Sequence, residues 1–239
     1  MLTLYVIFFQ MWKDKIKLIA FDADDTLWVN EQHYRNAERR FEKMMERFCT
    51  AGEANAKLLE VEKRNLPLLG YGTKPFIISL IECGVELSKG TLTNDEILQL
   101  ISIGKSTTGH SPELYPDAEE VIKSLAEKYP LSLLTKGDLL EQESKIARSG
   151  IESIFSSIEI MSEKNRSNYT RILKQHSVRP EEFVMVGNSF KSDIEPVLEI
   201  GGWAVYIPSE VTWAHEIVPE REHKRLIRAN NLKELLNIF

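Results

Sequence analysis

LIAFDADDT, residues 18–26, sets the architecture of this chain. Leu18 to Phe21 form a short apolar run of the kind that is buried on both faces of a parallel sheet. Asp22 and Asp24 follow at once, and ligands of such sheets bind beyond the carboxyl ends of the strands. The two carboxylates are therefore the first candidates for a functional site.

Further strand and helix patterns alternate after Pro116. Apolar runs typical of strands occupy residues 131–135, 157–161, 183–187, 203–207 and, more weakly, 226–229. Helical patterns occupy residues 117–128, 139–149, 166–176 and 193–200, and a short helix follows from residue 232. Asp117 is placed to support the N-terminus of the first of these helices. The alternation predicts an α/β fold with a doubly wound parallel sheet.

Residues 31–104 have a different pattern, in which charged and apolar positions alternate as on amphipathic helices. Glycine and proline breaks divide this segment into roughly four helices without a convincing strand. These breaks fall near Gly52, Pro67, Gly70 to Gly72, Gly84 and Gly90. We therefore expect an α/β core, residues 1–29 and 105–239, with an all-helical cap domain, residues 30–104, inserted into it.

Polar side chains also follow the later strands of the predicted sheet. Thr135 ends the run 131–135, Lys164 comes shortly after 157–161, and Asn188 and Asp193 follow 183–187. Because the carboxyl ends of parallel strands meet at one edge of the sheet, we expect these side chains to converge with Asp22 and Asp24.

These motifs resemble those of the haloacid dehalogenase-like hydrolase superfamily, in the branch that carries a helical cap after the first motif. DADDT at residues 22–26 matches the DxDxT motif of that family, and the apolar run that ends in Thr135 matches the second motif. Lys164 in SEKN matches the third motif, and GNSFKSD at residues 187–193 matches the fourth. The order and spacing agree from about Lys17 to the C-terminus, and the first motif is the most specific.

The resemblance implies a magnesium-dependent phosphatase with a covalent intermediate. Asp22 would attack phosphorus and form an aspartyl-phosphate. Asp24 would protonate the leaving oxygen and then deprotonate the water that cleaves the intermediate. Thr135 would donate a hydrogen bond to a phosphoryl oxygen, and Lys164 would hold Asp22 and the phosphoryl group. Thr26 would brace the first loop.

The metal implied by the resemblance is Mg²⁺, which binds oxygen ligands. Its ligands would be the Asp22 carboxylate, the backbone carbonyl of Asp24, and the side chains of Asn188 and Asp193. Asn188 departs from the family, which usually has aspartate at this position. With asparagine, the formal charges of the site and one Mg²⁺ cancel, whereas aspartate would leave one negative charge. We expect the metal to bind more weakly and Asp193 to contribute more to holding it.

The substrate predicted is a small soluble phosphate ester, enclosed by the cap. Asp24 argues against a dehalogenase, because dehalogenases of this superfamily have no acid two residues after the nucleophile. A phosphotransferase stays open, and so does a non-catalytic protein that binds a phospho-ligand or a partner on the same fold. Asp25 is expected to support the turn and Trp28 to pack at the hinge, while Lys136 fits either the site or a loop.

The composition excludes several other classes of protein. A net charge of −6 and a charged share of 28% are typical of a soluble globular protein and point neither to a nucleic-acid nor to a membrane surface. Cys49 and Cys83 form no CxxC pair, so neither a disulfide framework nor a zinc site is expected. We expect free thiols in a cytoplasmic protein, and the oligomeric state is left open.

The N-terminal run, residues 2–12, is strongly apolar. It is shorter than the roughly 20 residues that span a bilayer and lacks the basic region and cleavage site of a signal peptide. We interpret it as an extension ahead of an alternative start at Met11, although a strand or packing arm fits equally well.

Overall fold

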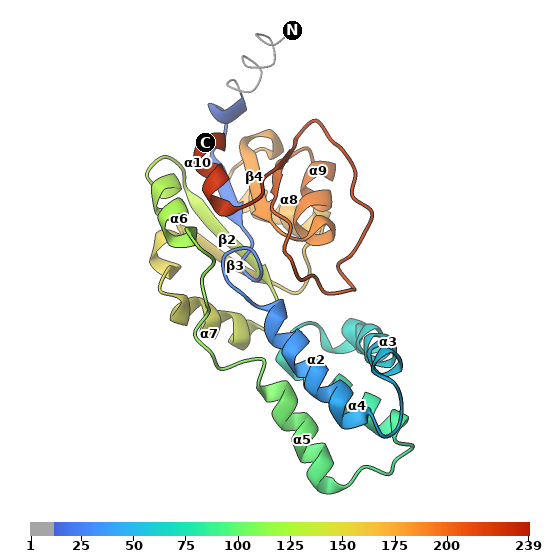
Figure 1. Ribbon diagram of the computed structural model, residues 1–239. Helices are drawn as coiled ribbons and strands as arrows, with labels where there is room; N and C mark the ends of the chain where they lie inside the picture. Colours follow the sequence, from blue (N-terminus) through green and yellow to red (C-terminus); the bar gives the residue numbers. More distant parts are fainter. Residues whose placement is uncertain (1–11) are drawn as a thin grey trace.

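The computed structural model describes residues 12–239, so the predictions for residues 1–10 and for Met11 lie outside its described part. Its centre is a parallel sheet of six strands in the order β3-β2-β1-β4-β5-β6 (Figure 1). The strands are β1 Leu18–Phe21, β2 Leu131–Lys136, β3 Ser157–Met161, β4 Phe183–Gly187, β5 Trp203–Tyr206 and β6 Leu226–Arg228. The predicted doubly wound parallel sheet is confirmed, with β1 in its interior.

Helices cover both faces of the sheet, and the alternation of side chains along β1 shows why. Ile19 and Phe21 pack on one face, in the cluster that includes residues of α6, α7 and α10. Leu18 and Ala20 pack on the opposite face, against α8 and α9. The helices are α6 Ala118–Ala126, α7 Leu139–Ser149, α8 Arg166–Gln175, α9 Glu195–Glu199 and α10 Leu235–Ile238. All four residues of β1 are buried, as expected for a strand between two helical layers.

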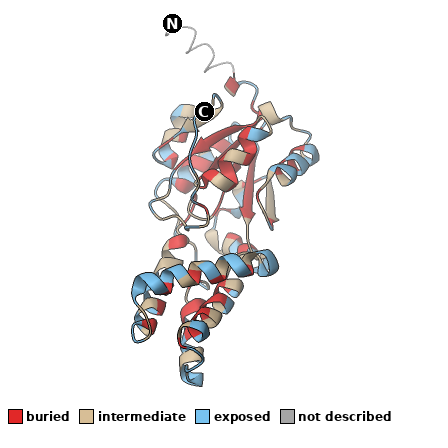
Figure 2. Cartoon of the chain, turned by 90° about the vertical axis from the view of Figure 1, so that its right-hand side faces the viewer, coloured by how far each residue is buried: buried red, intermediate tan, exposed pale blue. Residues whose placement is uncertain are grey.

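A second helical unit lies beyond the sheet and is inserted between β1 and β2 (Figures 1 and 2). Its helices are α2 Glu31–Met45, α3 Ala51–Leu69, α4 Thr73–Leu87 and α5 Asn94–Lys105. It has its own apolar core, in which Phe41, Leu58 and Leu80 are almost completely buried. The insertion therefore packs around a separate core, as the expected helical cap requires.

One of the expected helix breaks in this unit is wrong, since Gly84 lies inside α4. Gly52 lies in the first turn of α3 and Pro67 in its last turn, so helix boundaries fall near both, as expected. A Cβ atom at Gly84 would lie 2.7 Å from Leu100 Cδ1, so glycine there permits close packing of α4 on α5 rather than ending a helix. The breaks at Gly70 to Gly72 and at Gly90 are confirmed.

The expected capping role of Asp117 is also wrong. Its backbone is left-handed, with φ 64°, and its side chain makes no capping hydrogen bond to α6. Its carboxylate instead lies 3.5 Å from Lys233 Nζ, an exposed ion pair. The predicted start of the helix was correct, since α6 begins at the residue after Asp117. The backbone of Asp117, however, has the wrong conformation for an N-cap.

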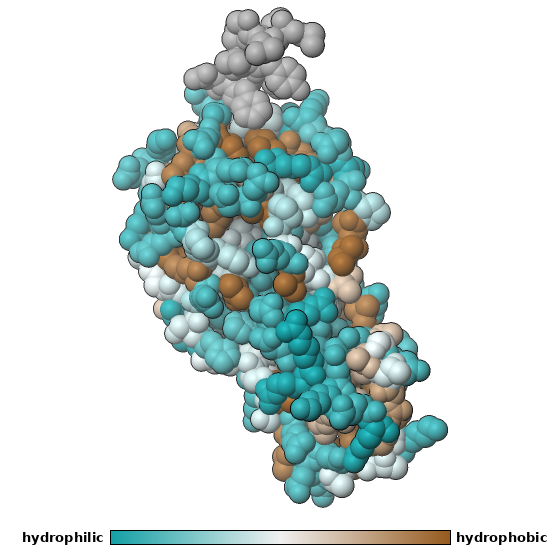
Figure 3. Space-filling model, viewed as in Figure 1, coloured by the Kyte–Doolittle hydropathy of each residue, from teal (hydrophilic) through white to brown (hydrophobic). Residues whose placement is uncertain are grey.

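In residues 12–239, every helix is either too short or too polar to cross a bilayer. The face of the molecule in Figure 3 is mostly hydrophilic, with apolar side chains in small separate groups.

Candidate active site

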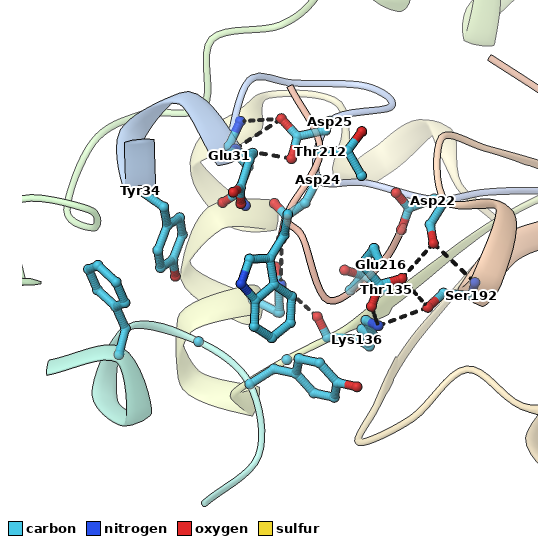
Figure 4. A pocket seen from close by; sticks show the side chains of 18 of the residues that line it. Asp22, Asp24, Asp25, Glu31, Tyr34, Thr135, Lys136, Ser192, Thr212 and Glu216 are labelled. Carbon is cyan, nitrogen blue, oxygen red and sulfur yellow. Dashed lines mark hydrogen bonds and ion pairs between the residues drawn. The ribbon is translucent and has the colours of Figure 1, made fainter. Parts of the chain in front are cut away.

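A cavity of about 180 Å³ lies between the carboxyl edge of the sheet and the helical insertion. Its lining comes from the residues that follow β1, β2, β3, β4 and β5, from α7, and from α2, α3 and α4 of the insertion. All the residues selected from the strand ends, including Thr135, contribute to this lining. Figure 4 shows the cavity with Asp22 and Ser192 on one side and Glu31 and Tyr34 on the other. We call the first side the core end and the second side the cap end.

At the core end, Lys164 joins two carboxylates that are far apart in the sequence. Its Nζ donates to Asp22 Oδ1 and, at 2.6 Å, to Asp193 Oδ1, and all three side chains are buried. Burial and the neighbouring Asp193 raise the pKa of Asp22 to about 7, against the opposing effect of Lys164. Burial alone would lower the pKa of Lys164, but the two carboxylates raise it, so Lys164 carries a positive charge.

The position of Asp193 depends on a tight turn after β4. A turn of π-helix, Phe190–Ile194, replaces the expected start of an α-helix at Asp193. Asp193 Oδ2 accepts the backbone N–H of Ser189 at 2.9 Å. A Cβ atom at Gly187 would lie 2.3 Å from Asp193 Oδ2, so only glycine leaves room for the carboxylate. Single π-turns of this kind are frequent at functional sites.

Oxygen atoms suited to a metal converge beside Asp22. One of the two terminal amide atoms of Asn188 faces Thr26 Oγ1. This atom lies 3.1 Å from Asp22 Oδ2 and 3.3 Å from the backbone oxygen of Asp24. Neighbouring ligands of octahedral Mg²⁺, each 2.0–2.1 Å from the ion, are about 3 Å apart. With its oxygen turned to this side, Asn188 therefore fits a magnesium site.

The same contacts have a second interpretation. With its nitrogen turned to this side, the Asn188 amide donates hydrogen bonds to Asp22 Oδ2 and to the Asp24 carbonyl. No cluster of three or more His, Cys, Asp or Glu side chains suited to a metal occurs in residues 12–239. The proposed ligand set is of another kind, because it includes an amide and a backbone carbonyl.

The Asp24 carboxylate is held by three side chains that the sequence analysis did not assign to it. Lys145 Nζ lies 2.8 Å from both of its oxygens, Gln142 Nε2 donates to Oδ2 at 2.8 Å, and Trp28 Nε1 donates to Oδ1 at 2.7 Å. Burial would raise the pKa of Asp24, but Lys145 with the other two donors holds it below its usual value. Asp24 is therefore ionised and firmly oriented.

Asp25 and Trp28 behave as expected. The Asp25 carboxylate accepts the backbone N–H groups of Asn30 and Glu31 at 3.0 Å and thereby caps α2. Trp28 is completely buried where the chain leaves the core for the insertion. Asp25 thus supports the turn, and Trp28 packs at the hinge.

Lys136 belongs to the site rather than to a surface loop. Its Nζ donates to Ser192 Oγ at 2.8 Å and to Glu216 Oε1 at 2.6 Å. Glu216 also accepts from Ser189 Oγ, so it connects the end of β2 to the turn after β4. The sequence carried a signal for Lys136, which directly follows Thr135, but none for Glu216, which lies in the long connection between β5 and β6.

The sheet order, the helical insertion after β1 and the acidic carboxyl edge define a capped α/β hydrolase. Comparison with known families agrees with this class. The model of the haloacid dehalogenase-like hydrolases matches residues 16–201, and the chain belongs to this family.

Individual relatives add to this assignment. A haloacid dehalogenase-like family hydrolase from Xanthomonas campestris is 36% identical and superposes with a TM-score of 0.84 over 94% of this chain and 92% of its own. YfnB from Bacillus subtilis, a haloacid dehalogenase-like (HAD) hydrolase bound to magnesium, is 17% identical. It superposes with a TM-score of 0.62 over 93% of this chain and 98% of its own. At this identity it supports the fold alone.

A curated relative is a glyceraldehyde 3-phosphate phosphatase from Methanothermobacter thermautotrophicus. It is 31% identical over 115 residues, which cover 46% of this chain and 49% of the relative. The chain thus matches about half the length of this relative.

Proposed function

We propose that the protein is a magnesium-dependent phosphomonoester hydrolase that acts on a small phosphorylated metabolite through an aspartyl-phosphate. The observation that carries this proposal is the buried group formed by Asp22, Lys164 and Asp193 at the core end of the cavity. A carboxylate nucleophile can attack a dianionic phosphate only where positive charge offsets the repulsion. Lys164 supplies one such charge in direct contact with Asp22.

The metal would be held by Asp22, the backbone carbonyl of Asp24, Asn188 and Asp193. When bound, Mg²⁺ supplies further positive charge against the phosphate dianion and the carboxylates. The contacts of Asn188 with Asp22 and with the Asp24 carbonyl support this ligand set, because their spacing suits adjacent octahedral positions.

Two substitutions at phosphorus complete the proposed reaction. In the first, an Asp22 oxygen forms a bond to phosphorus, the bond from phosphorus to the ester oxygen breaks, and Asp24 gives the leaving oxygen a proton. In the second, Asp24 takes a proton from water, the water oxygen bonds to phosphorus, and the bond to Asp22 breaks. Thr135 donates to a phosphoryl oxygen in both steps.

The environment of Asp24 suits the second step directly, since its carboxylate is ionised. For the first step, Asp24 must take up a proton when the substrate binds. An adjacent phosphate dianion favours that uptake, because a like charge raises the pKa of a carboxyl group. Asp24 also supports phosphate chemistry over dehalogenation, since only an alkoxide leaving group needs this proton.

Two further observations support a small phosphate ester. A cavity of about 180 Å³ is below the usual range for drug-sized ligands, roughly 300–1,000 Å³. The curated relative is named a glyceraldehyde 3-phosphate phosphatase, and the phosphorylated compound in that name has a short carbon chain. Both favour a leaving group of a few carbon atoms.

The test is phosphate release from 4-nitrophenyl phosphate, with and without Mg²⁺, by the wild type and by Asp22→Asn. We expect turnover that requires Mg²⁺ and is lost in the variant. Folded protein without turnover on a panel of phosphate esters would instead favour a non-catalytic phospho-ligand binder. Asn188 gives that second candidate a specific basis, because its amide nitrogen can occupy the metal position.

A further inference from the structure

Three carboxylates from the helical insertion line the cap end of the cavity. They are Glu31 and Glu38 of α2 and Glu62 of α3. Glu31 is 8% exposed and Glu38 is 7% exposed. Carboxylates are rarely buried without a paired cation, so the question is what balances the negative charge at this end of the cavity.

Arg35 is the cation in contact with this group, and two of its three nitrogens donate hydrogen bonds. NH1 donates to Glu38 Oε2 at 2.8 Å, and NH2 donates to the backbone oxygen of Thr212 at 3.1 Å. Nε lies 3.6 Å from Glu31 Oε1, beyond hydrogen-bond distance. Glu62 has its own donor, since Trp213 Nε1 lies 3.2 Å from Glu62 Oε2. One guanidinium therefore serves two carboxylates, Glu31 and Glu38, and it is hydrogen-bonded to only one of them.

Two buried acceptor atoms of the cavity lining have no hydrogen-bond donor. They are Glu31 Oε1 and Gln142 Oε1. Gln142 is 3% exposed, and its Nε2 already donates to Asp24 Oδ2 and to the Lys136 carbonyl. An unpaired buried acceptor costs about 1–3 kcal/mol, so such atoms in a ligand cavity indicate where a ligand donates.

The charge state of the group agrees with this interpretation. Burial, followed by the nearby carboxylates of Asp25 and Glu38, raises the pKa of Glu31 to about 9. Burial likewise raises the pKa of Glu62 to about 7, although Trp213 opposes the shift. A cation bound among these side chains would favour their charged form and so oppose both shifts.

We propose that the cap end of the cavity binds a protonated amine on the leaving group of the substrate, an inference that rests on the proposed phosphohydrolase function. The substrate class is a short amino-alkyl phosphate, with its phosphate at Asp22 and Lys164 and its ammonium group at Glu31. An ammonium has three N–H donors, which suits unpaired acceptors on Glu31 and Gln142. The two ends of the cavity then match the opposite charges of such a molecule.

A hydroxyl group on the leaving group is the alternative donor, and matched substrates separate the two. The pairs are 2-aminoethyl with 2-hydroxyethyl phosphate, and 3-aminopropyl with 3-hydroxypropyl phosphate. Each pair has the same chain length and differs only in the terminal group. We expect kcat/KM to be about tenfold or more higher for the amine in at least one pair, because a hydrogen bond between charged groups is the stronger one. Equal or better turnover of the hydroxyl compound in both pairs would overturn the proposal.

Glu31→Gln tests the assignment to this residue, because it keeps the shape and removes the charge. We expect the amine-to-hydroxyl ratio of kcat/KM to fall to within about threefold of unity. The matched control is Glu60→Gln on α3, where Glu60 is exposed and pairs with Lys57. That variant should keep the wild-type ratio, and an unchanged ratio in Glu31→Gln would contradict the proposal.

A binding measurement separates this inference from the proposed function. Calorimetry with 3-aminopropan-1-ol and propane-1,3-diol needs neither metal nor phosphate, and we expect only the amine to bind, with loss of binding in Glu31→Gln. Turnover of 4-nitrophenyl phosphate, with no preference for the amine in the matched pairs or in calorimetry, would contradict the amine site and support the phosphatase function. Binding of the amine without turnover of any ester would contradict the phosphatase function and support the amine site.

Discussion

The two ends of the cavity differ in how their charges are paired. At the core end each lysine contacts carboxylates directly: Lys164 holds Asp22 and Asp193, Lys145 holds Asp24, and Lys136 holds Glu216. At the cap end Glu31 Oε1 has no hydrogen bond, because Arg35 is hydrogen-bonded to Glu38 and lies 3.6 Å from Glu31.

This difference separates residues that perform chemistry from residues that select a ligand. Side chains that act on the same phosphoryl group in every cycle gain from being oriented in advance by the scaffold. Side chains that recognise a leaving group must keep their hydrogen-bonding capacity for it. The core end is held by strand ends and a π-turn, whereas the cap end is carried by helices with a separate core.

The strongest test of the core end is Asp22→Asn. Because the amide is not a nucleophile, we expect kcat for any accepted ester to fall by about 10³-fold or more. Steady-state phosphate release measures the loss, and circular dichroism confirms the fold. Activity within tenfold of the wild type would show that Asp22 is not the nucleophile and that the contrast between the ends has another meaning.

Gly187→Ala should have the next largest effect. Its methyl group would occupy the place of the Asp193 carboxylate, so Asp193 must move away from Lys164 and from the Ser189 N–H group. We expect a loss of about 100-fold in kcat/KM, since a displacement of 1 Å in a catalytic site costs about that much. The measurement is a Mg²⁺ titration of activity, which should also shift to higher metal concentration.

Gly52→Ala is the matched control for this substitution. Gly52 lies in α3, and a Cβ atom there meets nothing within 4 Å. Alanine should leave activity unchanged and stabilise the helix by up to about 1 kcal/mol. Equal losses in both glycine variants would indicate a general effect on folding rather than a specific effect on Asp193.

Much of the core end could be predicted from the sequence, because strand ends are readable from local patterns. The run before Asp22 and the position of Asn188 after β4 both follow from short apolar segments in a fixed order. The contacts of Asp24 with Lys145 and Gln142 could not be predicted. They join residues 118 and 121 positions apart, and nothing in the local pattern of α7 distinguishes Lys145 from a solvated lysine.

The carboxylates of the cap end were not predicted, although the cap itself was expected to enclose the substrate. Glu31, Glu38 and Glu62 lie in amphipathic helices, where charged residues are normally on the solvated face. These three side chains line the cavity only because α2 and α3 pack against the edge of the core. The error at Gly84 has a related cause, because local patterns do not show whether a glycine ends a helix or permits a close contact.

Lys145→Met should reduce activity by about tenfold, less than the changes above. The substitution removes two contacts from the Asp24 carboxylate, but Gln142 and Trp28 still orient it. We expect kcat to fall more than KM rises, because Asp24 acts on the leaving oxygen and on water rather than in binding. Lys123→Met, which removes an exposed ion pair with Glu119 on α6, is the control and should behave as the wild type.

The smallest expected effect concerns stability, and it tests whether Glu31 is strained when no ligand is bound. Its pKa is about 9 in the folded protein, whereas the pKa of an unperturbed glutamate carboxyl group is 4.5. Between these values the folded state holds a proton that the unfolded state has lost, so the stability of the wild type falls as pH rises from 5 to 8.

Glutamine does not titrate, so the Glu31→Gln variant does not lose stability in this way as the pH rises. Its Tm should exceed that of the wild type by a few degrees at pH 8 and by less at pH 5. Thermal denaturation at both pH values measures the difference, with the exposed Glu60→Gln as the reference. A Tm advantage that is the same at both pH values, or larger at pH 5, would mean that Glu31 is already paired in the free protein. The cap end would then resemble the core end, and the physical basis for an amine in the substrate would be lost.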